Sequence, residues 1–268
     1  MSATWLVLSI GCLVLGTFAY GLAGAKLHDG SRATGGALRS RSWWTGTVLQ
    51  AVGFLGTFVA RRSLPVVVVQ ASSGVGLAIT AIIQQLTGVQ RLTGRSATAI
   101  GVLVAGLVLI AWSIVPGPAV AIRAAHLWLL AGCAVLAVVL AVVPLPAWAS
   151  GAASGLGFSY GAIAARLLMS DTLPALWRFW ELPLSAWLAG LLMASGVVLG
   201  QYHLTRGLAR GQAAPVLGIM YAVESFFPAG VGFWLLAEAP RPGGWIPMLS
   251  GLVLTILGVC ILAGRTTA

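Results

Sequence analysis

The sequence contains Leu15-Gly-Thr-Phe-Ala-Tyr20-Gly-Leu-Ala-Gly-Ala-Lys26-Leu27, and about 140 residues later it reads Leu156-Gly-Phe-Ser-Tyr160-Gly-Ala-Ile-Ala-Ala-Arg166-Leu167. In both stretches a leucine-glycine pair, a tyrosine-glycine pair, small residues and one basic residue follow in the same order. Internal self-similarity of this kind is the sequence signature of a repeated architecture. The echo therefore predicts that the chain consists of two related halves.

The composition indicates a membrane protein. Of the 268 residues, 59% are hydrophobic and only 7% are charged, whereas a soluble domain carries about 25% charged residues. Such a chain cannot cover a surface that faces water, so we expect most of its exterior to face lipid. The net charge of +10 does not indicate a nucleic-acid partner, because the basic residues stand singly between apolar runs.

Nine apolar segments are long enough to cross a bilayer, which takes about 20 residues. Turn-forming clusters such as Pro116-Gly117-Pro118 separate them. All eleven tryptophans fall in loops or near segment ends, where the indole ring favours the headgroup layer. The predicted spans are 4–25, 43–60, 64–87, 97–115, 125–143, 147–168, 184–205, 213–236 and 245–263.

The basic residues predict how these spans are oriented. One side of the predicted membrane collects nine of them, including Arg32, Arg206 and Arg210, and the other collects six, including Arg166 and Arg241. Lysine and arginine accumulate in cytoplasmic loops. We therefore expect a multi-pass protein of the cell (inner) membrane with its N-terminus outside and its C-terminus in the cytoplasm.

With nine spans, the first and the sixth cross the membrane in opposite directions. Three further parallels follow in order along the two halves: Arg62-Ser-Leu64 with Arg206-Gly-Leu208, Pro65 with Pro215, and Gly101 with Gly251. We expect one all-α polytopic membrane domain over 1–268 with an inverted-topology repeat. Its parts are a first repeat of four helices (4–115), one connector helix (116–146) and a second repeat of four helices (147–263).

Several motifs resemble the drug/metabolite transporter superfamily. They are the stretch from Leu156 to Arg166 and the run from Gln201 to Gly258, in which a proline-bearing helix ends in Leu235-Leu236-Ala237-Glu238. The likeness extends to its EamA-like members. The nine spans, Trp43-Trp44 and Pro65 also look like the NIPA-type magnesium transporters. The resemblance implies a helical transporter fold.

Inverted repeats are typical of secondary transporters, whose substrate site lies between the repeats. We therefore expect gradient-driven transport of a small metabolite or drug-like solute by alternating access, with protons as a candidate coupling ion. A NIPA-like divalent cation (magnesium) transporter and a non-transporting membrane scaffold or accessory subunit remain as alternatives. The expected partners are the lipid bilayer and a small-molecule or cation substrate, no nucleic acid is expected, and a homodimer is open.

Glu224 is the sharpest candidate for the substrate or proton site. It lies halfway along the eighth predicted span, where an ionised carboxylate costs several kcal/mol unless it is paired or hydrated. Such an acid faces the bundle interior as a proton carrier, a cation ligand or a counter-ion; the alternative is a protonated acid that only packs. Tyr221 lies on the same helical face, and Pro228 is expected to kink the helix and free a carbonyl.

Other polar side chains in predicted spans are further candidates for lining a substrate cavity. Packing between helices is the alternative role for the serines, and helix anchoring is the alternative for the two tyrosines of the echo. These candidates are Gln70, Ser72, Ser73, Gln50, Gln201, Tyr20 and Tyr160.

Nothing in the sequence indicates an enzyme. It has no paired carboxylates, no zinc-binding HExxH pattern and no phosphate-binding glycine loop. The three cysteines lie inside apolar runs without metal-ligand spacing, so neither a metal site nor a cofactor is expected. The remaining acids, Asp29, Asp171, Glu181 and Glu238, are expected to be solvated charges in loops or at span ends.

The orientation can be tested with single cysteines in a variant whose three native cysteines are replaced by alanine. A membrane-impermeant maleimide should label Pro242→Cys in intact cells, because that loop is predicted to lie outside. It should label Arg39→Cys only after the cells are permeabilised. The opposite pattern would reverse the predicted topology.

Overall fold

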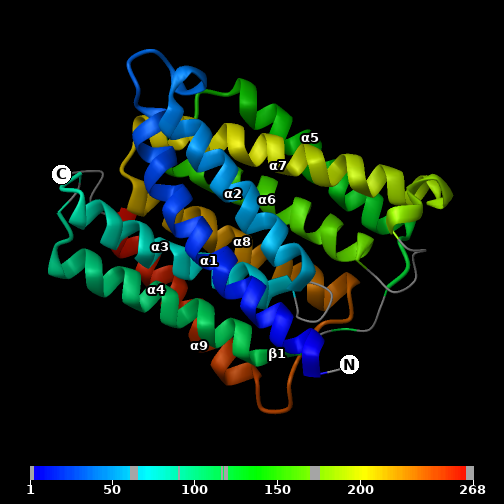
Figure 1. The fold of residues 1–268 in the computed structure, drawn as a ribbon. Helices are drawn as coiled ribbons and strands as arrows, with labels where there is room; N and C mark the ends of the chain where they lie inside the picture. The colour runs from blue at the N-terminus through cyan, green and yellow to red at the C-terminus, as the bar shows by residue number, and fades with distance from the viewer. Residues whose placement is uncertain are drawn as a thin grey trace.

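The computed structural model describes residues 3–60, 66–89, 91–115, 117, 120–169 and 176–263. These residues form an all-α bundle, as predicted (Figure 1). Its nine helices are α1 (Ala3–Ser31), α2 (Arg41–Ala60), α3 (Val66–Leu86), α4 (Gly94–Ser113), α5 (Ala124–Val142), α6 (Ala147–Leu168), α7 (Leu184–Arg210), α8 (Ala213–Leu235) and α9 (Trp245–Ala263).

Shorter elements connect these helices. Two 3-10 turns, η1 (Ala37–Arg39) and η2 (Leu176–Glu181), precede α2 and α7. A two-residue antiparallel ladder joins β1 (Ile114–Val115) to β2 (Ala239–Pro240). This ladder ties the end of α4 to the loop between α8 and α9.

In the described part of the chain, six helices are long and apolar enough to cross a membrane: α1, α4, α5, α7, α8 and α9. This is compatible with an all-α membrane protein, while the count of nine spans stays a prediction. Helix α6 is outside this set. Glycine and serine lower its hydropathy, yet 15 of its 22 residues are buried, so it meets protein rather than lipid.

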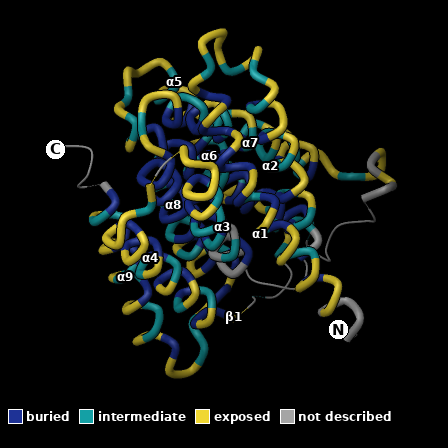
Figure 2. Tube along the Cα trace, turned by 60° about the vertical axis from the view of Figure 1, so that its left-hand side comes forward, coloured by how far each residue is buried: buried dark blue, intermediate teal, exposed yellow. Residues whose placement is uncertain are grey.

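Most of the helices pack in pairs, and contacts of α8 with α3 and α6 join these pairs. Helix α1 packs against α2 and α3, and α6 packs against α7 and α8. Helix α4 lies along α9, α3 lies along α8, and α5 lies at the edge of the bundle against α6 and α7 (Figure 1). Figure 2 shows the burial that results, with buried residues inside the bundle and exposed ones around it.

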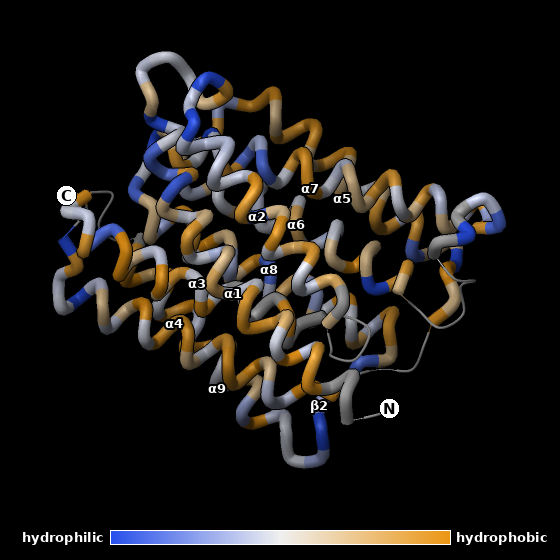
Figure 3. The backbone as a smooth tube through the Cα atoms, viewed as in Figure 1, coloured by the Kyte–Doolittle hydropathy of each residue, from blue (hydrophilic) through white to orange (hydrophobic). Residues whose placement is uncertain are grey.

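The outer surface of the bundle is apolar. Large hydrophobic side chains such as Leu15, Val142 and Ile246 are exposed. In Figure 3 the most hydrophilic segments lie mainly in the loops and helix ends, while hydrophobic residues run along the helices. This arrangement suits a helical bundle surrounded by lipid, because each helix satisfies its own backbone hydrogen bonds.

Close backbone contacts replace large side chains where helices cross. A Cβ added at Gly251 of α9 would lie 2.6 Å from the carbonyl oxygen of Gly106 in α4. A Cβ added at Gly157 of α6 would lie 2.7 Å from the Cα of Gly200 in α7. Small residues at such crossings permit the van der Waals contact on which helix association in lipid depends.

Basic residues cap helix ends at one end of the bundle. Arg206 donates to the carbonyl of Ala141 at 3.0 Å, at the C-terminus of α5. Arg210 donates to Leu145 O at 3.1 Å, and Arg32 donates to Leu208 O at 3.2 Å, near the C-terminus of α7. Three residues predicted on one side of the membrane thus lie together and donate to carbonyls at helix C-termini or in the loop after α5.

Replacing Gly106 by alanine should destabilise the protein, because the new methyl group meets the backbone of Gly251 and the Thr255 side chain. Overpacking of this kind costs about 1–3 kcal/mol. Gly101 in the same helix is the matched control, since a Cβ there meets nothing within 4 Å. Thermal unfolding in detergent should show a lower Tm for Gly106→Ala alone; equal Tm values would contradict the α4–α9 contact.

Candidate functional site

A cavity of about 420 Å³ lies between α1 and α2 on one side and α6, α7 and α8 on the other. Side chains from all five helices line it. Five predicted site residues are among them: Tyr20, Gln50, Gln201, Tyr221 and Glu224. The fold therefore brings together, around one cavity, residues from four helices that are far apart in the sequence.

Glu224 is the only charged residue among the described residues that line the cavity. Its side chain is buried in α8, with 5% of the residue exposed. Pro228 is also buried in α8, and because proline has no N–H it donates no hydrogen bond to the carbonyl of Glu224. A buried acid and a backbone carbonyl that receives no hydrogen bond from Pro228 thus occur together in α8.

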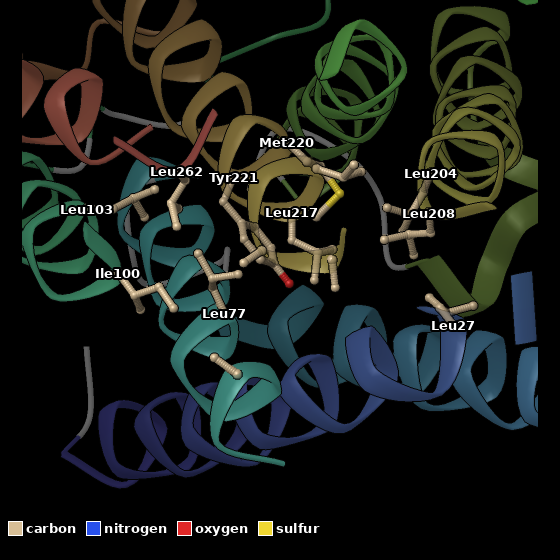
Figure 4. Packing of buried hydrophobic residues seen from close by; sticks show 14 of the residues in the cluster. Leu27, Leu77, Ile100, Leu103, Leu204, Leu208, Leu217, Met220, Tyr221 and Leu262 are labelled. Atoms are coloured by element: carbon tan, nitrogen blue, oxygen red, sulfur yellow. The ribbon is translucent and has the colours of Figure 1, made fainter. Parts of the chain in front are cut away.

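Tyr221 lies one turn before Glu224 and extends from α8 toward α1 (Figure 4). It is buried in a hydrophobic cluster with Leu77, Leu103 and Met220. Tyr20 of α1 reaches the same cavity, and its ring lies against α2, 3.2 Å from a Cβ added at Gly53. The two tyrosines therefore bring aromatic surface to the cavity from opposite sides.

Two glutamines supply amide groups at the cavity. Gln201 Nε2 of α7 donates to Thr47 Oγ1 of α2 at 3.3 Å. Gln50 also lines the cavity, and its buried Oε1 has no hydrogen-bond partner among the described residues. A buried acceptor that lacks a donor costs free energy until one is provided.

Other predicted site residues lie outside the cavity. The hydroxyl of Tyr160 lies 3.1 Å from Ser195 Oγ, and the ring packs in a separate hydrophobic cluster. Ser72 Oγ donates to Val69 O at 2.7 Å within α3. The side chains of Gln70 and Ser73 lie outside the described residues. Because Tyr160 packs between helices, the two tyrosines of the echo differ in surroundings.

The apolar part of the site was not predicted from the sequence. Phe54 of α2 and Phe158 of α6 line the cavity, together with Thr47. The sequence alone does not distinguish an aromatic residue that lines a cavity from one that packs in the core of a membrane protein. Thr47 lies one turn before Gln50 on the same helical face, and this spacing could have predicted that Thr47 lines the cavity too.

The expectation for Glu238 is wrong, since this acid is buried rather than solvated. Its Oε1 lies 3.6 Å from Nε of Arg166, whose Nη2 donates to Gly117 O at 3.2 Å. The loop folds inward because Glu238 N donates to Gly232 O and the β1–β2 ladder follows directly. A buried ion pair thus joins three segments at the end of the bundle opposite Arg32.

Among the remaining acids, Glu181 and Asp29 lie at helix ends, as expected. Glu181 is half-exposed and lies 3.1 Å from Arg178. Asp29 is also half-exposed, beside His28. Asp171 lies outside the described residues.

The residues of this site are suited to binding a small molecule. Its wall is mostly apolar and aromatic, with a carboxylate, amides and hydroxyls at a few points, as in sites for small organic molecules. The described residues bring no three His, Cys, Asp or Glu side chains together as a metal-binding group. Comparisons of the chain with protein-family models, with curated proteins and with solved structures find no match.

Glu238→Gln should destabilise the fold, because it leaves the Arg166 guanidinium buried without its counter-ion. Breaking a buried pair by removing one partner costs about 3–5 kcal/mol. Glu181→Gln is the matched control, since exposed pairs contribute at most about 1 kcal/mol.

Unfolding in detergent, followed by circular dichroism, separates the two variants. The pair replacement Arg166→Met with Glu238→Leu should recover most of the loss, because no unpaired charge remains. Equal effects of Glu238→Gln and Glu181→Gln would contradict the burial of the Arg166–Glu238 pair.

Proposed function

We propose that the protein is a secondary transporter that moves a small metabolite or drug-like solute across the cell membrane by alternating access. The observation that carries this proposal is the cavity that Glu224 shares with Tyr20, Gln50, Gln201 and Tyr221. Its volume of about 420 Å³ lies within the range of sites for small organic molecules.

The packing of the helices supports an inverted repeat of four helices, one connector and four helices. Helices α1, α2 and α3 pack together as α6, α7 and α8 do. The third and fourth helices of one half lie against their counterparts in the other, α3 on α8 and α4 on α9. Helix α5, the proposed connector, lies outside this arrangement. The resemblance to the drug/metabolite transporter superfamily points the same way.

The position of the cavity suits alternating access. The lining residues belong to the second half of α1, the middle of α2 and α7 and the first half of α8, so the cavity lies between the two ends of the bundle. Toward the end where Arg32, Arg206 and Arg210 gather, Trp43 Nε1 of α2 donates to Thr205 Oγ1 of α7 at 2.9 Å, and Gln201 donates to Thr47. At the other end, Arg166 and Glu238 hold loop segments together. Contacts of this kind at the two ends of a central cavity would break and re-form in turn during alternating access.

Glu224 is the proposed coupling group. A carboxylate in an apolar cavity is stable when it holds a proton or when it pairs with a cationic group. Proton binding and solute binding at one carboxylate would therefore compete, which couples the two fluxes.

The alternatives receive less support. Mg²⁺ favours oxygen ligands and usually carboxylates, and the described lining offers one carboxylate within a mostly apolar wall. A membrane scaffold needs no cavity with a buried acid. Gradient-driven transport of an organic solute remains the function that this geometry supports best.

The proposal predicts that Glu224→Gln removes the response to a proton gradient. Purified protein in liposomes, screened against metabolites and cations, should transport a solute faster with an imposed pH gradient. Glu224→Gln should lose this acceleration because an amide binds no proton in this range, and Glu181→Gln should behave like the native protein. If Glu224→Gln responds to the gradient as the native protein does, Glu224 is not the coupling group.

A further inference from the structure

We propose that the arginine-rich end of the bundle is a gate between the first half (α1–α4) and the second half (α6–α9), that Arg32 is its latch, and that three buried polar side chains favour its opening. This inference rests on the proposed function and names the residues through which one end opens. It follows from which helices meet at this end, which polar atoms are buried there, and which bonds cross between the halves.

The C-terminal ends of α1 and α3 lie side by side at this end. Thr17 Oγ1 of α1 donates to Ser72 O of α3 at 3.3 Å. Two turns further along both helices, a Cβ added at Gly24 would lie 2.5 Å from Thr80 Oγ1. The two helices are therefore parallel, and α8 of the second half packs against both of them.

Three polar side chains are buried one or two turns beyond that contact. His28 and Ser31 continue the same face of α1 and Gln84 continues that of α3, and their exposed fractions are 6%, 8% and 3%. Both ring nitrogens of His28, Ser31 Oγ and Gln84 Nε2 have no hydrogen-bond partner among the described residues. Asp29 Oδ1 lies 3.8 Å from His28 Nδ1, too far for a hydrogen bond.

These atoms make the closed arrangement of this end costly. A buried donor or acceptor without a partner carries a free-energy penalty, because it has lost its hydrogen bonds to water. Separation of α1 and α3 from α8 would return water to all three side chains. Opening of this end therefore removes a penalty that closure imposes.

Arg32 opposes that separation. From α1 it donates through Nε to Leu208 O at 3.2 Å and through Nη2 to Gly211 O at 2.6 Å, at the C-terminus of α7. Leu27 of α1 and Leu208 also belong to one hydrophobic cluster. Because the Arg32 side chain is exposed, water can replace both of its bonds when the halves separate. Arg32 is thus a latch that can be released.

The opposite end is joined through the backbone. The β1–β2 ladder connects the end of α4 in the first half to the α8–α9 loop of the second half. Arg241 N in that loop also donates to Ser113 O of α4 at 2.9 Å. From this conformation the arginine-rich end is therefore the easier of the two to open.

The cost of the buried polar atoms is tested by thermal unfolding of the full chain in detergent. Gln84→Met replaces an amide by an apolar chain of similar length and should raise Tm by about 2–4 °C. The matched control is Thr80→Val, one turn earlier in α3, which should lower Tm because Thr80 Oγ1 donates to Gly21 O at 2.8 Å. A lower Tm for Gln84→Met would show that the amide is bonded in the closed state and would overturn the proposal.

The latch is tested by the rate at which a water-soluble maleimide labels Gln84→Cys in nanodiscs, with the three native cysteines replaced by alanine. Arg32→Gln should raise this rate about tenfold, since labelling follows the population of the open state. Arg210→Gln is the matched control and should leave the rate unchanged, because Arg210 donates at the same end to Leu145 O, outside the first half. Equal rates in the two variants would overturn the role of Arg32. Labelling of Gln84→Cys as fast as that of Arg39→Cys, in an exposed loop, would show that this end is not closed and would overturn the gate.

A second reporter connects the buried polar atoms to the opening. Gln84→Met should slow the labelling of Ser31→Cys, because it removes part of the penalty of the closed state. An unchanged or faster rate would contradict a role of these atoms in the gate.

These results separate the inference from the proposed function. If a solute is transported in liposomes but Arg32→Gln leaves the labelling of Gln84→Cys unchanged, transport stands and the latch is wrong. If labelling responds as expected but no solute is carried, the gate stands and the transport proposal fails.

Discussion

Close contact between glycines is the constraint on which the rest of this structure depends. Lipid offers no hydrophobic drive for helices to associate, so they associate through van der Waals contact and buried polar groups. Gly16 approaches Gly53 between α1 and α2, and Gly157 approaches Gly200 between α6 and α7. Each pair is thereby held as a unit. The cavity lies where the two pairs face each other without such contact, lined instead by tyrosine and phenylalanine side chains.

The contrast between tightly packed helix pairs and the cavity between them explains where charged side chains can lie. The exterior is apolar, and the acids that enter the bundle do so with a defined environment. Glu238 pairs with Arg166 at one end, where the pair ties loop segments together. Glu224 stands beside a cavity large enough for a solute or water. The first arrangement holds loop segments together at one end, and the second places a carboxylate beside the cavity, which is the basis of the proposed coupling.

Much of this follows from the sequence, and the exceptions have physical reasons. Apolar run lengths predicted all nine helices, since their bounds depend on local composition. The positions of Glu224, Tyr221 and Gln201 within apolar spans predicted polar groups that line one cavity. Tyr160 was not separable from Tyr20, because their neighbouring residues are alike and only tertiary packing distinguishes them. Glu238 was misjudged because its burial depends on the β1–β2 ladder, which two residues from each strand form across a long sequence separation.

The most direct test of alternating access is a pair of distances between spin labels at the two ends of the bundle. Labels at Arg41 and Ala209 report on the arginine-rich end, and labels at Val7 and Leu184 report on the other end. Alternating access predicts that neutralising Glu224, by low pH or by Glu224→Gln, changes the two distances in opposite directions. Distances that both stay fixed, or that change in the same direction, would contradict it.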